Sequence, residues 1–192
     1  ADFVFNERGS LVNNGNGDNY GIELTLEKFF SKGYYMLATA SIYESTYTGS
    51  DGVERNTAFN NNYVFNGLFG KEWPVGKSKR NAITFDTKIT TTGGTPYTPI
   101  DLEATRANGG REVYEQDRAF SERYDPYFRW DVKFGFRLNG KKSKVSHQIF
   151  VDLQNVTNRE NVFVERYNPV KDEINTVTQQ GFFPDFMYRI QF

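Results

Sequence analysis

Residues 127–138 alternate between apolar and polar side chains without interruption. One parity holds the apolar residues Phe128, Trp130, Val132, Phe134, Phe136 and Leu138, and the other holds Arg129, Asp131, Lys133, Gly135 and Arg137. A period of two predicts a β-strand with one apolar and one charged face. The apolar face must be buried against a second sheet or in lipid, and about ten residues is also the length that a tilted strand needs to cross a bilayer.

The same alternation predicts strands elsewhere in the chain. We expect them at residues 20–30, 34–47, 60–73, 81–91, 145–156 and 186–192, with residues 3–5 as the tail of an earlier strand. The parity is less clean where Leu37, Tyr43, Val64 and Leu68 fall among polar positions. A small hairpin is expected from residues 162–167 and 173–178. The predicted fold class is all-β, with antiparallel strands.

The connections between these strands alternate in length. Short turns are expected at about residues 31–33, 74–80 and 139–144, and long loops at about residues 48–59, 92–125 and 157–184. If each strand is antiparallel to the next, the short turns all lie at one end and the long loops at the other. Outer-membrane barrels show this polarity, with short periplasmic turns and long extracellular loops, whereas a sandwich has no reason to sort its loops.

Composition narrows these choices. Aromatic residues make up 17% of the 192 residues, cysteine is absent, and the net charge of -1 gives no signal for nucleic acid. The mean hydropathy is -0.66 and no long apolar run occurs, so a transmembrane helix is excluded but a barrel is not. The sequence begins with Ala1 and not with a methionine, so we expect a processed chain or a piece of a longer one.

The Asn/Gly-rich residues 13–19 are expected as a loop. Their spacing matches no EF-hand calcium site.

The placement of aromatic and of charged residues is expected in the wall of a transmembrane barrel, but it can also occur in the sheet of a soluble protein. Aromatic residues near the predicted strand ends would form interfacial girdles: Phe29, Phe30, Tyr34, Tyr35 and Trp73 beside short turns, and Tyr124, Tyr127 and Phe128 beside a long loop. The polar parities carry both signs of charge: Glu23, Glu27, Asp86, Lys88, Arg129, Asp131, Lys133, Arg137, Asp152 and Arg189. These charges would face a plug or an open channel in a barrel, and solvent in a soluble sheet.

Four segments carry a family resemblance. They are residues 94–99 (GTPYTP), 127–133 (YFRWDVK), 153–158 (LQNVTN) and 188–192 (YRIQF). Their order and spacing resemble the C-terminal part of a TonB-dependent outer-membrane receptor, with Bacteroidetes members most similar. The resemblance covers nearly the whole chain, although Thr157 stands where many relatives carry an aromatic residue.

The resemblance implies a transporter of the bacterial outer membrane. Such receptors have a barrel of roughly 22 strands occluded by an N-terminal plug, and residues 1–192 would supply about the last seven strands and the last three extracellular loops. The implied partners are outer-membrane lipid, the barrel-assembly machinery, TonB acting through the plug, and a siderophore, cobalamin, glycan or similar cargo. These residues contain neither a plug nor a TonB box, and the sequence does not choose the cargo.

The candidate site residues fall into two groups. Aromatic and Arg side chains of the long loop are the candidates for ligand binding: Tyr97, Arg106, Arg111, Tyr114, Arg118 and Tyr124. The closing residues Phe186, Tyr188, Ile190 and Phe192 resemble a barrel-assembly signal, or serve as simple lipid-facing packing. No catalytic residue, metal ligand or cofactor is predicted, because the single His147 has no nucleophile motif or paired ligand. The alternatives are a self-contained small outer-membrane barrel and a soluble β-sandwich binding module.

Overall fold

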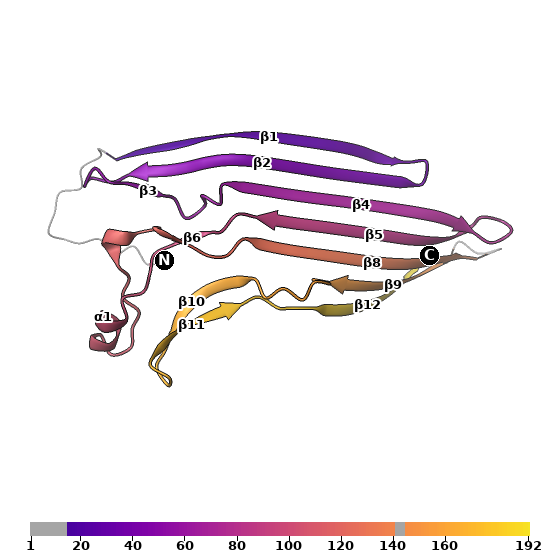
Figure 1. Ribbon diagram of the computed structural model, residues 1–192. Coiled ribbons are helices and arrows are strands. Elements are labelled where there is room, and N and C mark those ends of the chain that lie inside the picture. Colours follow the sequence, from indigo (N-terminus) through magenta and orange to yellow (C-terminus); the bar gives the residue numbers. More distant parts are fainter. Residues whose placement is uncertain (1–14, 141–144) are drawn as a thin grey trace.

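The protein is an all-β molecule built around one antiparallel sheet, seen in a computed structural model that describes residues 15–140 and 145–192 (Figure 1). The strands of this sheet follow the order β1-β2-β4-β5-β8-β9-β12, and β3 pairs with β2. The main strands are β1 (Asn16–Ser31), β2 (Tyr34–Thr48), β4 (Tyr63–Val75), β5 (Asn81–Thr92), β8 (Tyr127–Asn139), β9 (Ser146–Gln154) and β12 (Phe183–Gln191). Each one pairs with its neighbour along the main path.

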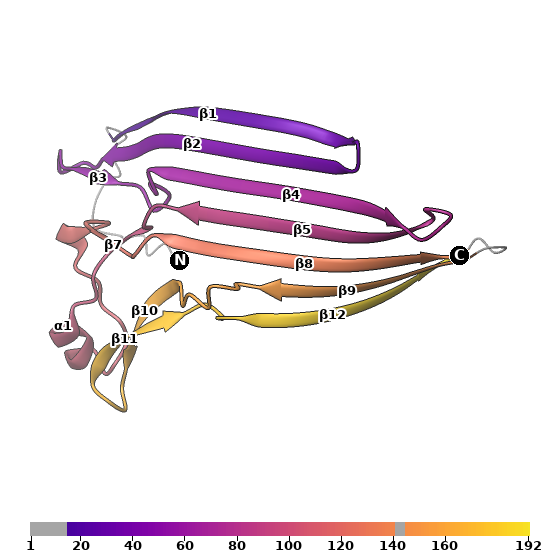
Figure 2. The same cartoon turned by 45° about the vertical axis from the view of Figure 1, so that its right-hand side comes forward.

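The shorter elements all belong to the long connections. They are β3 (Glu54–Asn56), β6 (Pro96–Tyr97), α1 (Leu102–Ala107), the 3-10 helix η1 (Gln116–Arg118), β7 (Glu122–Arg123), β10 (Val162–Asn168) and β11 (Glu173–Thr178). Strands β6 and β7 pair with each other, and β10 and β11 form the predicted hairpin. Figure 2 shows the long connections at one end of the sheet and the short turns at the other.

The predicted strands are confirmed, with boundaries that differ by a few residues. The largest difference is at the start of β1, where residues 16–19 were expected in a loop but pair with residues 45–48 of β2. The prediction was wrong there because the ladder with a long partner strand outweighs the turn preference of Asn and Gly. Residues 13 and 14 of that predicted loop, the strand tail at residues 3–5 and turn residues 141–144 lie outside the described part of the chain.

The turn between β1 and β2 shows how the local sequence sets the hairpin. Lys32 and Gly33 have φ values of 53° and 76°, so both lie in the left-handed region. Two consecutive residues with positive φ form the two-residue hairpin loop whose twist matches that of the flanking strands. The predicted short turn at residues 31–33 is therefore confirmed.

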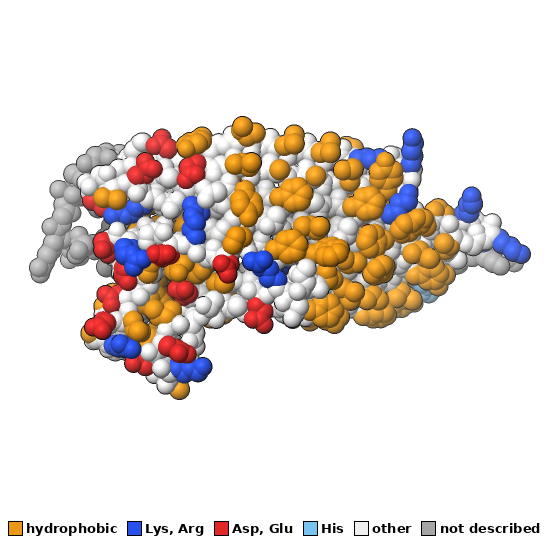
Figure 3. Space-filling view, in the orientation of Figure 1, with side chains coloured by type: hydrophobic (Ala, Val, Ile, Leu, Met, Phe, Trp, Pro, Cys, Tyr) orange, Lys and Arg blue, Asp and Glu red, His pale blue; other side chains and the backbone are white. Residues whose placement is uncertain are grey.

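The register places the predicted apolar parities on one face of the sheet. One row of facing residues runs through Leu26, Ala38, Gly67, Ile89 and Trp130. Figure 3 shows the result as a broad apolar band between two polar ends. The band continues to β12, so six strand-to-strand pairings keep the same orientation.

The apolar face is also the exposed face. On β8, Trp130 and Phe134 are 39% and 49% exposed, whereas Arg129, Asp131 and Lys133 are only partly exposed. Among residues 15–140 and 145–192, Ala82 and Ile100 are the buried hydrophobic residues. The apolar side chains of β8 are thus at least as exposed as its charged ones, which is unusual for a sheet that faces water on its polar side.

The sheet is open in the described part of the chain. Strands β1 and β12 stand at the two ends of the strand order and do not pair with each other. The exposure of the apolar residues on β1, such as Ile22 at 80%, also means that no second sheet within these residues covers that face. An edge strand presents a row of backbone N–H and C=O groups without hydrogen-bond partners. Its apolar face is in addition not packed against another element.

Candidate functional site

The polar face of the sheet carries an ordered layer of charge. All ten charged residues predicted to share this face do so by register. Asp86, Lys133 and Asp152 face one another across three strands. Arg137 pairs with Glu72 on β4. Charges of both signs therefore alternate across the sheet, and they can hydrogen-bond to whatever covers this face.

Two aromatic rings lie over strand glycines on the polar face. The Tyr35 hydroxyl donates a 2.6 Å hydrogen bond to Asp86, and a Cβ on the intervening Gly70 would lie 2.1 Å from the Tyr35 ring. In the same way, a Cβ on Gly135 would lie 2.7 Å from the ring of Phe150. Each glycine is thus required because it leaves room for a ring.

The aromatic residues expected beside the short turns do not all lie on the apolar face. Phe29 and Trp73 are 77% and 45% exposed, and Tyr34 shares the apolar face. Tyr35 was wrongly included because strand alternation turns it to the polar face. At the other end of the sheet, Tyr127 lies on the opposite parity from Phe128 for the same reason.

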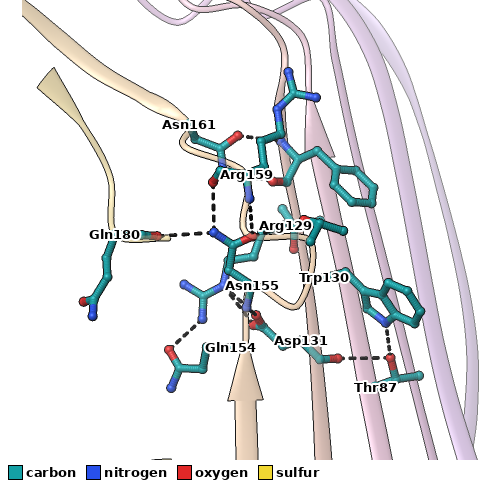
Figure 4. Close-up of polar contacts among 12 residues, drawn as sticks. Thr87, Arg129, Trp130, Asp131, Gln154, Asn155, Arg159, Asn161 and Gln180 are labelled. Carbon is teal, nitrogen blue, oxygen red and sulfur yellow. Dashed lines mark hydrogen bonds and ion pairs between the residues drawn. The ribbon is translucent and has the colours of Figure 1, made fainter. Parts of the chain in front are cut away.

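The junction between β8, β9 and the last long loop is a hydrogen-bonded cluster centred on Asn155 (Figure 4). Its backbone N–H donates to the Asp131 carboxylate at 2.8 Å, and its side-chain amide donates to the carbonyls of Arg159 and Gln180 at 2.9 and 3.3 Å. Asn155 is 2% exposed and has a φ of 50°. Asparagine suits this position because it tolerates the left-handed region and bonds to nearby backbone.

The strand residues around Asp131 hold its carboxylate in place. The Arg129 Nε donates to Asp131 at 2.7 Å, and its Nη2 donates to Gln154 at 2.9 Å. On the apolar side, the Trp130 indole N–H donates to the Thr87 hydroxyl at 2.7 Å, as Figure 4 shows. The segment 127–133 therefore connects three neighbouring strands to the loop that follows β9.

Asn161 fastens the same loop to the start of β8. Its Nδ2 donates to the Phe128 carbonyl and its Oδ1 accepts from the Phe128 N–H, both at 2.9 Å. The Asn161 carbonyl also accepts from the Gln179 N–H at 2.7 Å. The Asn161 side chain therefore bonds to Phe128 as the backbone of a neighbouring strand would. Asn161 is 5% exposed.

The two longest loops meet through a stacked tyrosine pair. Tyr97 and Tyr124 stack with their ring centroids 4.1 Å apart and their planes at 5°. The Tyr124 hydroxyl accepts from the Glu165 N–H at 3.1 Å, and the Tyr97 hydroxyl lies 3.4 Å from the Glu165 carboxylate. Burial, followed by the negative charge of Glu165, raises the pKa of Tyr97 to about 12.

Glu112 is the second point of attachment between these loops. Its carboxylate accepts from the Tyr167 N–H at 3.0 Å, from the Arg166 guanidinium at 2.9 Å and from the Tyr114 hydroxyl at 2.9 Å. Burial acts to raise the pKa of Glu112, but these hydrogen bonds outweigh burial and lower it below its ordinary value. Beside it, Arg106 forms an ion pair of 2.8 Å with Asp172 in the turn of the β10–β11 hairpin.

The structure does not gather the six predicted ligand-binding residues into one site. Tyr97 and Tyr124 stack on each other, while Tyr114 and Arg106 contact Glu112 and Asp172. Arg118 pairs with Glu115 and Glu122, and Arg111 is exposed. Tyr97, Tyr124 and Arg106 thus hold the two loops together, whereas Tyr114 and Arg118 bond within their own loop. Sequence patterns missed Glu112, Glu165 and Asn161, because each one acts through a partner that is distant along the chain.

A pocket of about 330 Å³ lies at the base of the loops. It is lined mainly by polar and aromatic residues, including Asn61, Thr95, Tyr124, Asp125, Asn161 and Phe163. Hydroxyl, amide and carboxylate groups beside aromatic rings suit a polar organic ligand. This pocket is the candidate ligand site of the loop end.

The predicted terminal group lies on and just beyond the edge strand β12. Phe186, Tyr188 and Ile190 are 66%, 52% and 42% exposed, and Phe192 follows the strand. Tyr188 accepts or donates a 2.7 Å hydrogen bond with His147 Nδ1 on β9. Within the described residues, no group of three or more His, Cys, Asp or Glu is placed to hold a metal ion.

The fold defines an all-β protein with one open, antiparallel sheet whose apolar face is exposed. Among the described residues, no helix has the length and apolar character needed to cross a membrane. Comparisons with protein-family models, curated proteins and solved structures found no match to this chain.

Proposed function

We propose that the chain is the C-terminal part of the barrel of a TonB-dependent receptor in a bacterial outer membrane. The observation that carries this proposal is the continuous face of exposed aromatic and aliphatic side chains, with the charged side chains gathered on the opposite face of the sheet. Lipid is the environment in which such an arrangement is stable, since a barrel wall alternates between lipid-facing and lumen-facing residues. A soluble sandwich would instead bury this face.

The two open edges support a larger barrel rather than a closed unit of seven strands. In hydrocarbon, each unsatisfied backbone group costs several kcal/mol, so β1 and β12 need partner strands. Other strands of the same polypeptide would supply them. The charged polar face would then surround a plug, whose displacement through TonB would release cargo from the loop end.

The position of the short turns at one end of the sheet and the long loops at the other also supports an outer-membrane barrel. The short turns would face the periplasm, and the loops joined at Tyr97–Tyr124 and Glu112 would face outward with the 330 Å³ pocket. Cargo of the siderophore, cobalamin or glycan type would be captured there. The exposed residues Phe186, Tyr188, Ile190 and Phe192 would provide the signal read by the barrel-assembly machinery.

Two measurements on the intact product of the gene test this proposal. The first is migration on a cold SDS gel before and after boiling, for protein extracted from outer membranes. A folded barrel migrates faster before boiling, whereas a soluble protein released without detergent contradicts the proposal. The second is uptake of candidate cargo with and without TonB, because a barrel that is not energy-coupled would transport equally in both strains.

A further inference from the structure

The two described short turns of the sheet carry cations and no acids. Residues 31–33 and 76–80 contain no Asp or Glu, and their basic members are Lys32, Lys77, Lys79 and Arg80. The long connections contain both signs. Figure 3 shows Lys and Arg without Asp or Glu at the β1–β2 and β4–β5 turns, next to the apolar band.

Two further lysines lie on the apolar face itself, close to this end. Lys28 faces Met36 by register, and Lys71 faces Tyr34 on one side and Phe85 on the other. Their ammonium groups lie 3.7 and 5.3 Å from the centroid of the Tyr34 ring. The two positive charges therefore converge on one aromatic ring within an apolar surface.

The surrounding contacts hold these lysines near the turn. The Lys28 Nζ donates to the Ser31 hydroxyl at 2.8 Å and to the Tyr34 carbonyl at 3.2 Å. The Lys71 Nζ lies 3.5 Å from the carbonyl of Lys32. A lysine on the lipid face is costly at the bilayer midplane and costs little near the interface. The next residue on this face of β4, Trp73, is of the type enriched at that interface.

We propose that Lys28, Lys71 and Tyr34 bind the phosphate of an anionic glycerophospholipid. The inference rests on the proposed function, since it requires the apolar face to contact a bilayer. Ammonium groups form charge-assisted hydrogen bonds with phosphate oxygens. The acyl chains would lie along Phe69 and Phe85, which continue the same face from Met36 and Lys71. That apolar continuation selects a lipid over a soluble phosphate.

Trp73 gives a local readout of this site. The intact gene product is reconstituted in phosphatidylcholine vesicles that contain either brominated phosphatidylcholine or brominated phosphatidylglycerol, and fluorescence quenching is measured. The signal of a Trp73→Phe variant is subtracted to isolate this residue. We expect a preference for the anionic lipid of up to about 25-fold, with roughly fivefold lost for each of the two lysines removed.

The variants distinguish the effect of removing a positive charge at this site from the effect of removing one elsewhere. Lys71→Gln and Lys28→Gln should lower the preference, and Lys71→Arg should keep it. Lys88→Gln removes the same charge from the polar face of β5 and should leave the preference unchanged. Heat-modifiable migration of each variant verifies that it folds, which matters for Lys28 because it also donates to the turn.

The possible results distinguish the two proposals. Equal quenching by both brominated lipids, or a preference that Lys71→Gln leaves intact, would overturn the lipid site and leave the barrel proposal standing. Absence of quenching by either lipid would show that Trp73 does not contact a bilayer, and would overturn both.

Discussion

The Tyr35 hydroxyl donates a 2.6 Å hydrogen bond to the Asp86 carboxylate, although the two residues lie on strands that are not adjacent. The strand between them is β4, and the bond passes over Gly70. Three strands are thus connected by one side-chain contact on the polar face.

We expect Gly70→Ala to destabilise the folded protein by about 1–3 kcal/mol, the usual range for overpacking. The new methyl group would lie 2.1 Å from the Tyr35 ring and 2.6 Å from Asp86, so the ring must move and its hydrogen bond is lost. Gly67→Ala is the matched control on the same strand, because its Cβ would meet only the Phe65 ring at 3.6 Å. Urea titration of both variants in vesicles measures the difference, and equal losses would contradict this account.

The two faces of β8 should respond differently to charge. Phe134→Arg places a cation on the exposed apolar face near the middle of the strand and should cost roughly 2–4 kcal/mol in a bilayer. Lys133→Gln alters the neighbouring residue on the polar face and should be tolerated better. The yield of heat-modifiable protein in the outer membrane measures both. Similar losses for the two variants would argue against lipid contact at Phe134.

Asn161→Ala should loosen the last long loop from the sheet. The change removes both hydrogen bonds to Phe128 and leaves its backbone groups unsatisfied, at a cost of about 1–3 kcal/mol. We expect faster proteolytic cleavage within residues 155–182. Glu160→Ala, at an adjacent exposed position, is the control and should leave the cleavage rate near that of the unaltered protein.

Acid should weaken the attachment of the β10–β11 hairpin to the loop that contains Glu112. The pKa of Glu112 is lowered in the folded state, so its contribution is complete above the ordinary value of 4.5 and declines as the pH falls through the lowered pKa. Hydrogen exchange of residues 162–178, corrected for intrinsic rates, should therefore accelerate at acidic pH. Glu112→Gln should show fast exchange at neutral pH and less change on acidification; an unchanged pH response would exclude Glu112 as the cause.

The alternation of apolar and polar residues was sufficient to predict the strands of the sheet, because it shows within each strand which side chains lie on the apolar face. Residues 127–138 specify both the strand and the orientation of Trp130 and Arg129. The start of β1 was missed because the pairing of residues 16–19 depends on β2 rather than on local preference. Tyr35 was misplaced because a position beside a turn does not override strand alternation, which directs this side chain to the polar face.

The loop contacts were not predictable in the same way. Tyr97 and Tyr124 were correctly selected as notable residues, but the sequence could not show that they stack on each other. Glu112 and Arg166 are 54 positions apart and have no periodic relation. Contacts of this kind depend on how two irregular segments fold back over the sheet, and a single sequence carries no local signal for them.

Every neighbouring pair along the main path of the sheet is also consecutive among the long strands of the chain. Within residues 15–140 and 145–192, no segment crosses over another strand of this path to reach its partner. A hairpin such as β4–β5 is therefore a removable unit, because deleting or duplicating it would change the width of the sheet without altering the connections between the other strands. The order of synthesis can then also be the order of pairing along the sheet, from β1 to β12.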